Sequence, residues 1–219
     1  MLTVHHLENS RSQRILWLLE ELGADYEIKH YKRSKTTNLA PAELKDIHPL
    51  GKSPVITHGD HVIAETGAIV EYILETIGGG RFMPAEEVDK LRYKFWLHYA
   101  EGSAMPPLLI KLVLDSMETK APALIRPIVK AATGKVKQNF LNPQLNTHLS
   151  FINDELMDVE WFVGGELSGA DFMMSFPLEA AANRAGASDY PAIKAFLARI
   201  HDRPAYKTAL EKGGPYAFA

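Results

Sequence analysis

The chain has 219 residues, of which 46% are hydrophobic, so it can bury a substantial core as one large domain or two small ones. Its 24 basic and 27 acidic residues give a formal net charge of −3, which offers no general reason to expect a nucleic acid or an anionic membrane as partner. The absence of cysteine excludes disulfides, thiolate metal sites and cysteine nucleophiles. No apolar run approaches the roughly 20 residues that span a bilayer, and residues 1–6 lack the basic start and long apolar core of a signal peptide, so we expect a cytoplasmic protein.

The first 80 residues predict strands and helices in alternation. Short strands are expected at residues 2–5 and 26–31, and between them apolar side chains recur at helical spacing over residues 15–22 before a glycine stop. Ser10 fits the N-cap of this helix, with Gln13 reaching back to complete a capping box. The two strands should be parallel neighbours joined by a right-handed crossover.

A short helix, a hairpin and a longer helix follow. The short helix is predicted at residues 41–46. Pairs of β-branched residues at 55–56 and 62–63 flank a Gly-Asp turn, which is a strong local hairpin signal. Apolar residues from 68 to 77 are spaced three or four apart, so the chain continues as an amphipathic helix with Thr66 at its N-cap.

The same stretch suits an extended, peptide-like ligand. If the bond before Pro54 is cis, the turn leaves the backbone of Val55 unpaired, and a ligand could pair with it as an added strand. Backbone N–H groups at Thr66 and Gly67 suit a carboxylate of that ligand, and Glu65 suits its ammonium group. An ordinary hairpin-to-helix connection with a structural proline explains the same residues, so the pattern alone leaves both interpretations open.

After residue 80 the sequence predicts helices only, beyond a glycine run and a proline that indicate a linker. The expected helices are one from near residue 86 that the prolines at 106 and 107 break or kink, a long region over 123–159 interrupted near 134 and 143, and shorter helices at 171–185, 191–202 and 204–211. The chain therefore divides into an α/β domain at residues 1–80 and an all-helical domain at residues 86–219.

The helix that begins near residue 168 carries the clearest start signal of the helical half. Ser168 is placed as N-cap, and Asp171 can accept a hydrogen bond from its backbone N–H, as in a capping box. Leu167 and Phe172 fit the accompanying hydrophobic staple. Because this pattern makes a helix start and offers no reactive site, we expect Asp171 to be structural.

Four motifs, in this order, carry a family resemblance: Ser10 to Trp17 after the first strand, Pro49 to Val55, Glu65-Thr66, and Leu167 to Asp171. On these motifs the chain resembles cytosolic glutathione S-transferases along essentially its whole length. It looks most like the bacterial and fungal branch that carries Ser-Arg-x-x-Arg after the first strand. The resemblance implies an α/β thioredoxin-like N-terminal domain, an all-α C-terminal domain that forms an electrophile pocket, a homodimer, and glutathione as cosubstrate.

Position by position, the resemblance implies a set of glutathione contacts. Pro54 matches the family's cis-proline, and Val55 matches the residue whose backbone pairs with the cysteinyl part of glutathione. Glu65 and Thr66 match the pair that holds the γ-glutamyl end. Lys52 is similar to the basic or amide residue near the glycyl carboxylate, and a solvated loop lysine is the alternative interpretation.

Two neighbouring residues are candidates for the group that faces the glutathione sulfur. The thiolate is the nucleophile, and a thiol with a pKa of about 8.5 is mostly protonated at neutral pH, so the chemistry needs a donor aimed at the sulfur. Ser10 offers a hydroxyl at a helix N-terminus. An ungapped count back from Arg14 and Ile15 instead places Asn9 where serine-type relatives keep their hydroxyl. The lack of cysteine argues against an omega-like type, and the lack of tyrosine before Tyr26 argues against the tyrosine types.

The resemblance therefore implies a glutathione transferase whose thiolate attacks an apolar electrophile or a hydroperoxide. Alternatives on the same fold are a non-enzymatic carrier or interaction protein, and a glutathione-dependent isomerase. No histidine pair at metal-ligand spacing suggests a metal site.

Overall fold

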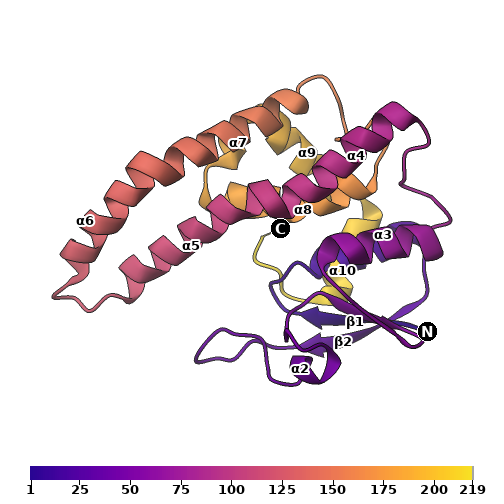
Figure 1. Cartoon of the computed structure of the whole chain (residues 1–219), viewed down its shortest axis with the longest axis horizontal. Helices are drawn as coiled ribbons and strands as arrows, with labels where there is room; N and C mark the ends of the chain where they lie inside the picture. The colour runs from indigo at the N-terminus through magenta and orange to yellow at the C-terminus, as the bar shows by residue number, and fades with distance from the viewer. Residues whose placement is uncertain (219) are drawn as a thin grey trace.

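The computed structural model describes residues 1–218. It confirms the predicted fold class: an α/β thioredoxin-like domain forms the N-terminal part of the chain, and the C-terminal part is helical (Figure 1). Within the described residues, no helix combines the length and the apolar character needed to cross a membrane.

The N-terminal domain is built on a four-stranded sheet. Its elements, in chain order, are β1 (Leu2–Leu7), α1 (Gln13–Leu22), β2 (Tyr26–Tyr31), α2 (Leu44–Ile47), β3 (Val55–His58), β4 (His61–Ala64) and α3 (Thr66–Thr76). The strand order is β2-β1-β3-β4. β1 and β2 are parallel, as predicted, and α1 connects them, whereas β3 runs antiparallel to both β1 and β4.

The two faces of the sheet are covered differently. α2 covers one face with Leu44, which is fully buried and packs with Leu7 and Tyr31. On the other face, α1 and α3 contact α8 (Gly169–Arg184) of the helical domain (Figure 1). The sheet therefore lies between α2 and a layer of helices that both domains share.

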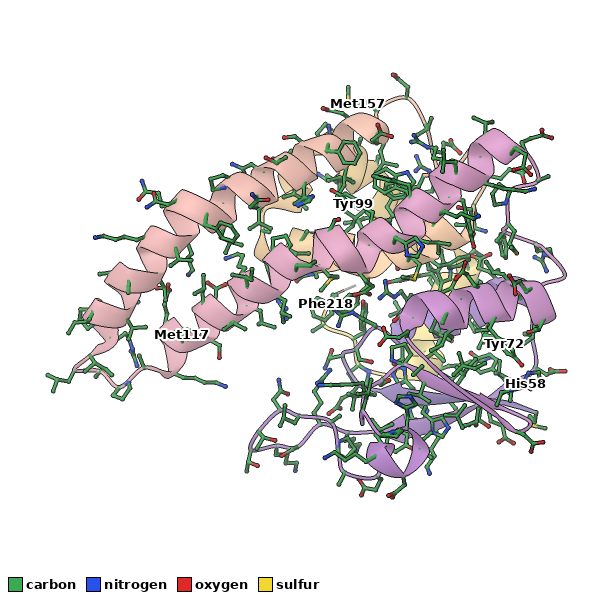
Figure 2. The ribbon with its side chains drawn as sticks, in the orientation of Figure 1. His58, Tyr72, Tyr99, Met117, Met157 and Phe218 are labelled. Atoms are coloured by element: carbon green, nitrogen blue, oxygen red, sulfur yellow. The ribbon has the colours of Figure 1, made fainter. Side chains whose placement is uncertain are left out.

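The helical part forms a long hairpin and a compact group of helices. Its elements are α4 (Glu87–Tyr99), η1 (Ala100–Ala104), α5 (Met105–Lys120), α6 (Arg126–Val136), η2 (Lys137–Leu141), α7 (Asn142–Glu155), α8, η3 (Ala187–Asp189), α9 (Pro191–Asp202) and α10 (Pro204–Gly213). α4 continues into α5 and α6 into α7, and the α5–α6 end of this hairpin projects from the body of the molecule (Figure 1). Met117 lies on the projecting part, whereas Phe218 lies at the centre of the molecule (Figure 2).

Of the predicted break or kink at Pro106 and Pro107, the break does not occur, because the helix continues through a π-helical turn. η1 joins α4 to α5, and the two prolines lie in the first turn of α5. The wider π turn changes the hydrogen-bond register just ahead of them, at the point where the missing proline N–H is tolerated. η2 joins α6 to α7 in the same way ahead of Pro143.

α8 is the buried centre of the helical domain. Its capping box is present as predicted: the backbone N and the Oγ of Ser168 both donate to Asp171 Oδ2 at 2.8 Å. Most of the helix is buried on every side, which is typical of a central helix. Phe172 packs on Trp17 of α1, with ring centroids 4.4 Å apart, so the two domains share one core.

Candidate functional site

Three loops meet at one edge of the sheet. β1 ends there at Leu7, β3 begins there at Val55 and β4 ends there at Ala64, because β3 is antiparallel to both neighbours. The register pairs Val55 with His5 on one side and with Ala64 on the other. Residues after β1, before β3 and after β4 are therefore neighbours in space although they are distant in sequence.

The turn before β3 is tied firmly to β1. The Ser53–Pro54 peptide bond is cis, and Pro54 is buried. Ser53 Oγ accepts a hydrogen bond from Leu7 N at 3.2 Å and donates one to His5 O at 2.9 Å. Lys52, one residue earlier, is exposed, so its ammonium group lies in solvent beside this turn.

The turn after β4 holds Glu65 at a positive φ, with φ 70° and ψ 122°. For a residue other than glycine this conformation costs on the order of 1–3 kcal/mol, and such strain clusters at binding sites. Glu65, and not Thr66 as predicted, is the N-cap of α3, because β4 leads into the helix with only this one residue between them. Thr66 is buried as the first helical residue, and the unpaired N–H groups of the first turn lie at this edge.

Ser10 does not cap α1, so the predicted capping box with Gln13 is wrong. α1 begins at Gln13 and its N-cap is Ser12. Ser10 is only 6% exposed, and its Oγ bonds to Ser12 Oγ at 2.8 Å and accepts from Ser12 N at 3.3 Å. The Gln13 side chain is buried against Gly213, where an added Cβ would lie 2.4 Å from Gln13 Oε1. The Ser10 hydroxyl is therefore turned into the protein.

The Asn9 side chain carries an amide donor, Nδ2, in addition to its acceptor. Its backbone has φ 50°, a conformation that asparagine adopts more readily than most residues. Asn9 Oδ1 accepts a hydrogen bond from Ala217 N at 2.8 Å, and the backbone O of Asn9 accepts one from Arg33 Nη2 at 3.1 Å. Among residues 1–218 no hydrogen bond involves Asn9 Nδ2. Of the two predicted candidates for the sulfur-facing group, Asn9 has a side-chain donor, Nδ2, with no hydrogen bond among residues 1–218, whereas the Ser10 hydroxyl is hydrogen-bonded to Ser12.

A buried histidine of β1 is hydrogen-bonded to the loop between β1 and α1. His6 is 3% exposed, and its Nδ1 bonds to Ser12 Oγ at 2.9 Å, which extends the hydroxyl pair toward β1. Burial, with a smaller contribution from His30, lowers the pKa of His6 to about 4. The imidazole is therefore neutral near pH 7.

This low pKa predicts a loss of stability in acid. The unfolded chain binds a proton at His6 near pH 6.5, whereas the folded chain binds it only near pH 4. The stability that neutral His6 provides is therefore complete above pH 6.5 and is lost as the pH falls toward 4. We expect the wild type to lose about 2 kcal/mol between pH 7 and pH 5 relative to His6→Asn. Urea denaturation of both proteins at each pH measures this, and parallel pH profiles would contradict it.

An ion-pair cluster that the sequence did not predict joins this loop to the helical domain. Arg14 is buried, and it donates to Met173 O of α8 and to Glu101 of η1. Arg11 Nε lies 3.0 Å from both carboxylate oxygens of Glu101. The guanidinium of Arg11 also lies 5.1 Å from the ring centroid of Phe176. The π turn η1 thus places a carboxylate against Arg11 and Arg14, which follow Asn9 and Ser10 in the sequence.

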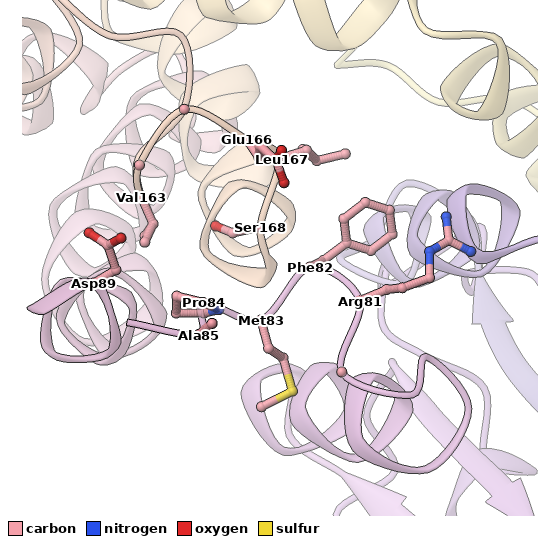
Figure 3. Close-up of a pocket in the computed structure, with 13 residues that line it drawn as sticks. Arg81, Phe82, Met83, Pro84, Ala85, Asp89, Val163, Glu166, Leu167 and Ser168 are labelled. Atoms are coloured by element: carbon pink, nitrogen blue, oxygen red, sulfur yellow. The ribbon is translucent and has the colours of Figure 1, made fainter. Parts of the chain in front are cut away.

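A separate cavity of about 520 Å³ lies between residues 80–85 and the loop at 163–168 (Figure 3). Asp89 and Ser168 form part of its wall, and within residues 1–218 its lining includes none of the predicted glutathione contacts. The described part of the chain also places no group of three or more His, Asp or Glu side chains where they could hold a metal ion. This cavity is thus separate from the candidate site at the edge of the sheet.

Comparison with known proteins identifies the family. Residues 1–75 match the glutathione S-transferase N-terminal domain, and residues 116–204 match the glutathione S-transferase C-terminal domain. Glutathione S-transferase 1 of Saccharomyces cerevisiae is 35% identical over 97% of this chain and 95% of its own length. Glutathione S-transferase 3 of Schizosaccharomyces pombe is 36% identical over 97% of this chain and 88% of its own.

Solved structures give the same result. A glutathione S-transferase from Actinobacillus pleuropneumoniae superposes with a TM-score of 0.80 and 35% identity, covering 100% of this chain and 95% of that one. A sphingomonad glutathione S-transferase in complex with glutathione has a TM-score of 0.71 and 25% identity, covering 97% and 98% of the two chains. The thioredoxin-like sheet and the helical partner domain agree with these matches, and the chain belongs to the glutathione S-transferase family.

Proposed function

We propose that this glutathione transferase binds glutathione at the edge where the three loops meet, and holds its sulfur as a thiolate for attack on an apolar electrophile or a hydroperoxide. The observation that carries this proposal is the register between Val55 and Ala64. It makes Pro54 and Val55 neighbours of Glu65 and Thr66, the two pairs that the family resemblance assigns to one glutathione molecule. The sphingomonad relative, whose structure contains glutathione, supports glutathione as the ligand.

In this proposal a different protein group binds each part of glutathione. The backbone of Val55 pairs with the cysteinyl unit as an added strand. Glu65 takes the ammonium of the γ-glutamyl end, and the first N–H groups of α3, at Thr66 and Gly67, take its carboxylate. Lys52, exposed in the same turn region, pairs with the glycyl carboxylate. The strained backbone of Glu65 supports a binding role, because strain persists where a site requires it.

Asn9 is the donor that we propose for the sulfur. A donor hydrogen-bonds the thiolate more strongly than the thiol, so it lowers the thiol pKa and increases the nucleophile at neutral pH. The Asn9 Nδ2 group is available for this, whereas the Ser10 hydroxyl is held by Ser12. Arg11 lies two positions after Asn9 and forms an ion pair with Glu101. Its positive charge also favours a thiolate over a thiol.

The second substrate is proposed to bind against the helical domain, residues 86–219. In conjugation, the sulfur lone pair forms a C–S bond with an electrophilic carbon, and the leaving group departs with its bonding electrons. Hydroperoxides are alternative acceptors for the same thiolate. We further propose that the enzyme acts as a homodimer in the cytoplasm.

Ultraviolet difference titration of bound glutathione tests the role of Asn9. We expect the wild type to show thiolate absorbance well below pH 8.5, the ordinary thiol pKa. Asn9→Gly should raise the thiol pKa by about one unit, which means about tenfold less thiolate at low pH. Glycine is chosen because it tolerates φ 50° without strain, which alanine does not. Ser10→Ala is the matched control and should leave the titration unchanged.

The other outcomes of this titration are equally informative. Loss of thiolate in Ser10→Ala alone would transfer the sulfur-facing role to the serine. Glutathione binding without thiolate in all three proteins would favour a non-enzymatic carrier on the same fold. If glutathione does not bind at all, the proposed site is wrong.

A further inference from the structure

The last residues of the chain return to the candidate site. After α10, Gly214 turns the backbone with φ 81°, and residues 214–218, here called the tail, run back toward the start of α1. Figure 2 shows Phe218 near the middle of the molecule. The tail thus lies at the junction of the two domains.

Side chains on α8 hold the tail in place. Tyr216 Oη donates to Glu179 Oε2 at 2.5 Å, and Glu179 is only 2% exposed. Phe218 is buried, and its ring lies 5.4 Å from that of Phe176 and 4.8 Å from the Arg184 guanidinium. One hydrogen bond to a buried carboxylate and one buried aromatic ring give the tail a defined conformation rather than a loose end.

The tail makes one direct contact with the loop after β1. The backbone N–H of Ala217 donates to Asn9 Oδ1 at 2.8 Å. A carboxamide has an acceptor on one side and a donor on the other, and an N–H group can bond only to the acceptor. This contact therefore decides which way the Asn9 amide faces: its oxygen points to the tail and its Nδ2 points away from it.

We propose that the tail is a positioning element of the thiol site, in which the Ala217 N–H orients the Asn9 amide so that Nδ2 faces the glutathione sulfur. This inference rests on the proposed function of Asn9. The backbone of Asn9 is fixed separately by Arg33, so within residues 1–218 the Ala217 contact is the one hydrogen bond that orients the side chain. Without it the amide can rotate and present its oxygen, which repels a thiolate.

A proline at position 217 tests the contact directly, because proline has no N–H. In Ala217→Pro we expect glutathione to bind as in the wild type, while the pKa of the bound thiol rises toward that of Asn9→Gly, with about tenfold less thiolate at low pH. Ala217→Ser keeps the N–H and should restore the wild-type titration. A tail that only stabilises the fold would lower the melting temperature of Ala217→Pro without moving the thiol pKa.

Two further proteins make the test decisive. Deletion of residues 215–219 removes the contact without a proline and should shift the titration as Ala217→Pro does. The double variant Asn9→Gly, Ala217→Pro should show no more loss than Asn9→Gly alone, because both changes act through one amide. An additive loss, or a wild-type titration in Ala217→Pro, would overturn the tail proposal while leaving the transferase proposal intact. Absence of thiolate in the wild type would instead overturn the proposed function itself.

Discussion

Glu101→Gln is expected to destabilise the protein by about 3 kcal/mol. The Arg14 side chain is only 1% exposed, and it donates to Met173 O and to the Glu101 carboxylate. Burial alone would raise the pKa of Glu101, but the charges of Arg14 and Arg11 outweigh it and lower that pKa below its ordinary value. The carboxylate is therefore ionised at neutral pH, and it balances a guanidinium that has no access to water. Glutamine leaves that charge buried without a counter-charge.

Urea denaturation of a double-mutant cycle measures this effect. Arg14→Met keeps much of the side-chain length without charge, so Arg14→Met combined with Glu101→Gln contains no unpaired buried cation. We expect the combination to recover at least about 1 kcal/mol of the Glu101→Gln loss. Asp202→Asn is the control, because it breaks an exposed ion pair with Lys207, and such pairs contribute little. Equal losses in Glu101→Gln and Asp202→Asn would show that the buried cluster is not special.

Much of the fold follows from signals that are local in the sequence. The hairpin of β3 and β4 depends on a Gly-Asp turn between β-branched pairs, and α3 depends on apolar spacing just after it. The capping box of α8 depends on Ser168 and Asp171, three positions apart. In each case the residues that decide the structure are within a few positions of each other, so propensity and spacing are sufficient to predict it.

The errors and omissions depend on contacts between distant segments. The sequence pattern predicts Ser10 as an N-cap, but its hydroxyl is hydrogen-bonded to the hydroxyl of Ser12. The Ser12 hydroxyl is in turn hydrogen-bonded to His6 of β1. Glu101 is 87 positions from Arg14, and no spacing rule connects them. Arg14, next to the apolar run Ile15 to Leu19 of α1, was the available signal, since a buried arginine needs a counter-charge. That signal indicates that a carboxylate is needed without identifying which one.

The candidate site likewise combines features that local motifs predict with contacts between distant segments. Pro54, Val55, Glu65 and Thr66 were predicted as ligand contacts from their own motifs, and pairing of β3 with β4 makes those motifs neighbours. The contact of Asn9 with the tail spans 208 positions and involves a backbone N–H, which has no residue-type signature. Backbone contacts of this kind are visible only once the chain has folded.

Asp171→Ala is expected to cost about 3–5 kcal/mol, more than the roughly 0.5–2 kcal/mol of an ordinary cap. The Asp171 side chain is fully buried and accepts three hydrogen bonds: from Phe162 N at 2.9 Å, and from the backbone N and the Oγ of Ser168 at 2.8 Å each. Burial raises the pKa of Asp171 to about 6, although the three hydrogen bonds act to lower it. The carboxylate is therefore ionised at pH 7.5. Alanine leaves two backbone N–H groups without an acceptor in a dry interior, which is the larger part of the cost.

Denaturation at pH 7.5, followed by circular dichroism, measures the loss. Ser168→Ala is the matched control: it removes one donor but leaves the carboxylate with its two backbone partners, so it should cost only about 1 kcal/mol. An Asp171→Ala protein as stable as Ser168→Ala would show that the carboxylate is not what holds the start of α8. Because Phe172, the next residue, packs on Trp17 of α1, weakening this helix start removes support from both domains. We therefore expect the transition of Asp171→Ala to shift as a whole, with the helical and sheet domains unfolding together rather than in two steps.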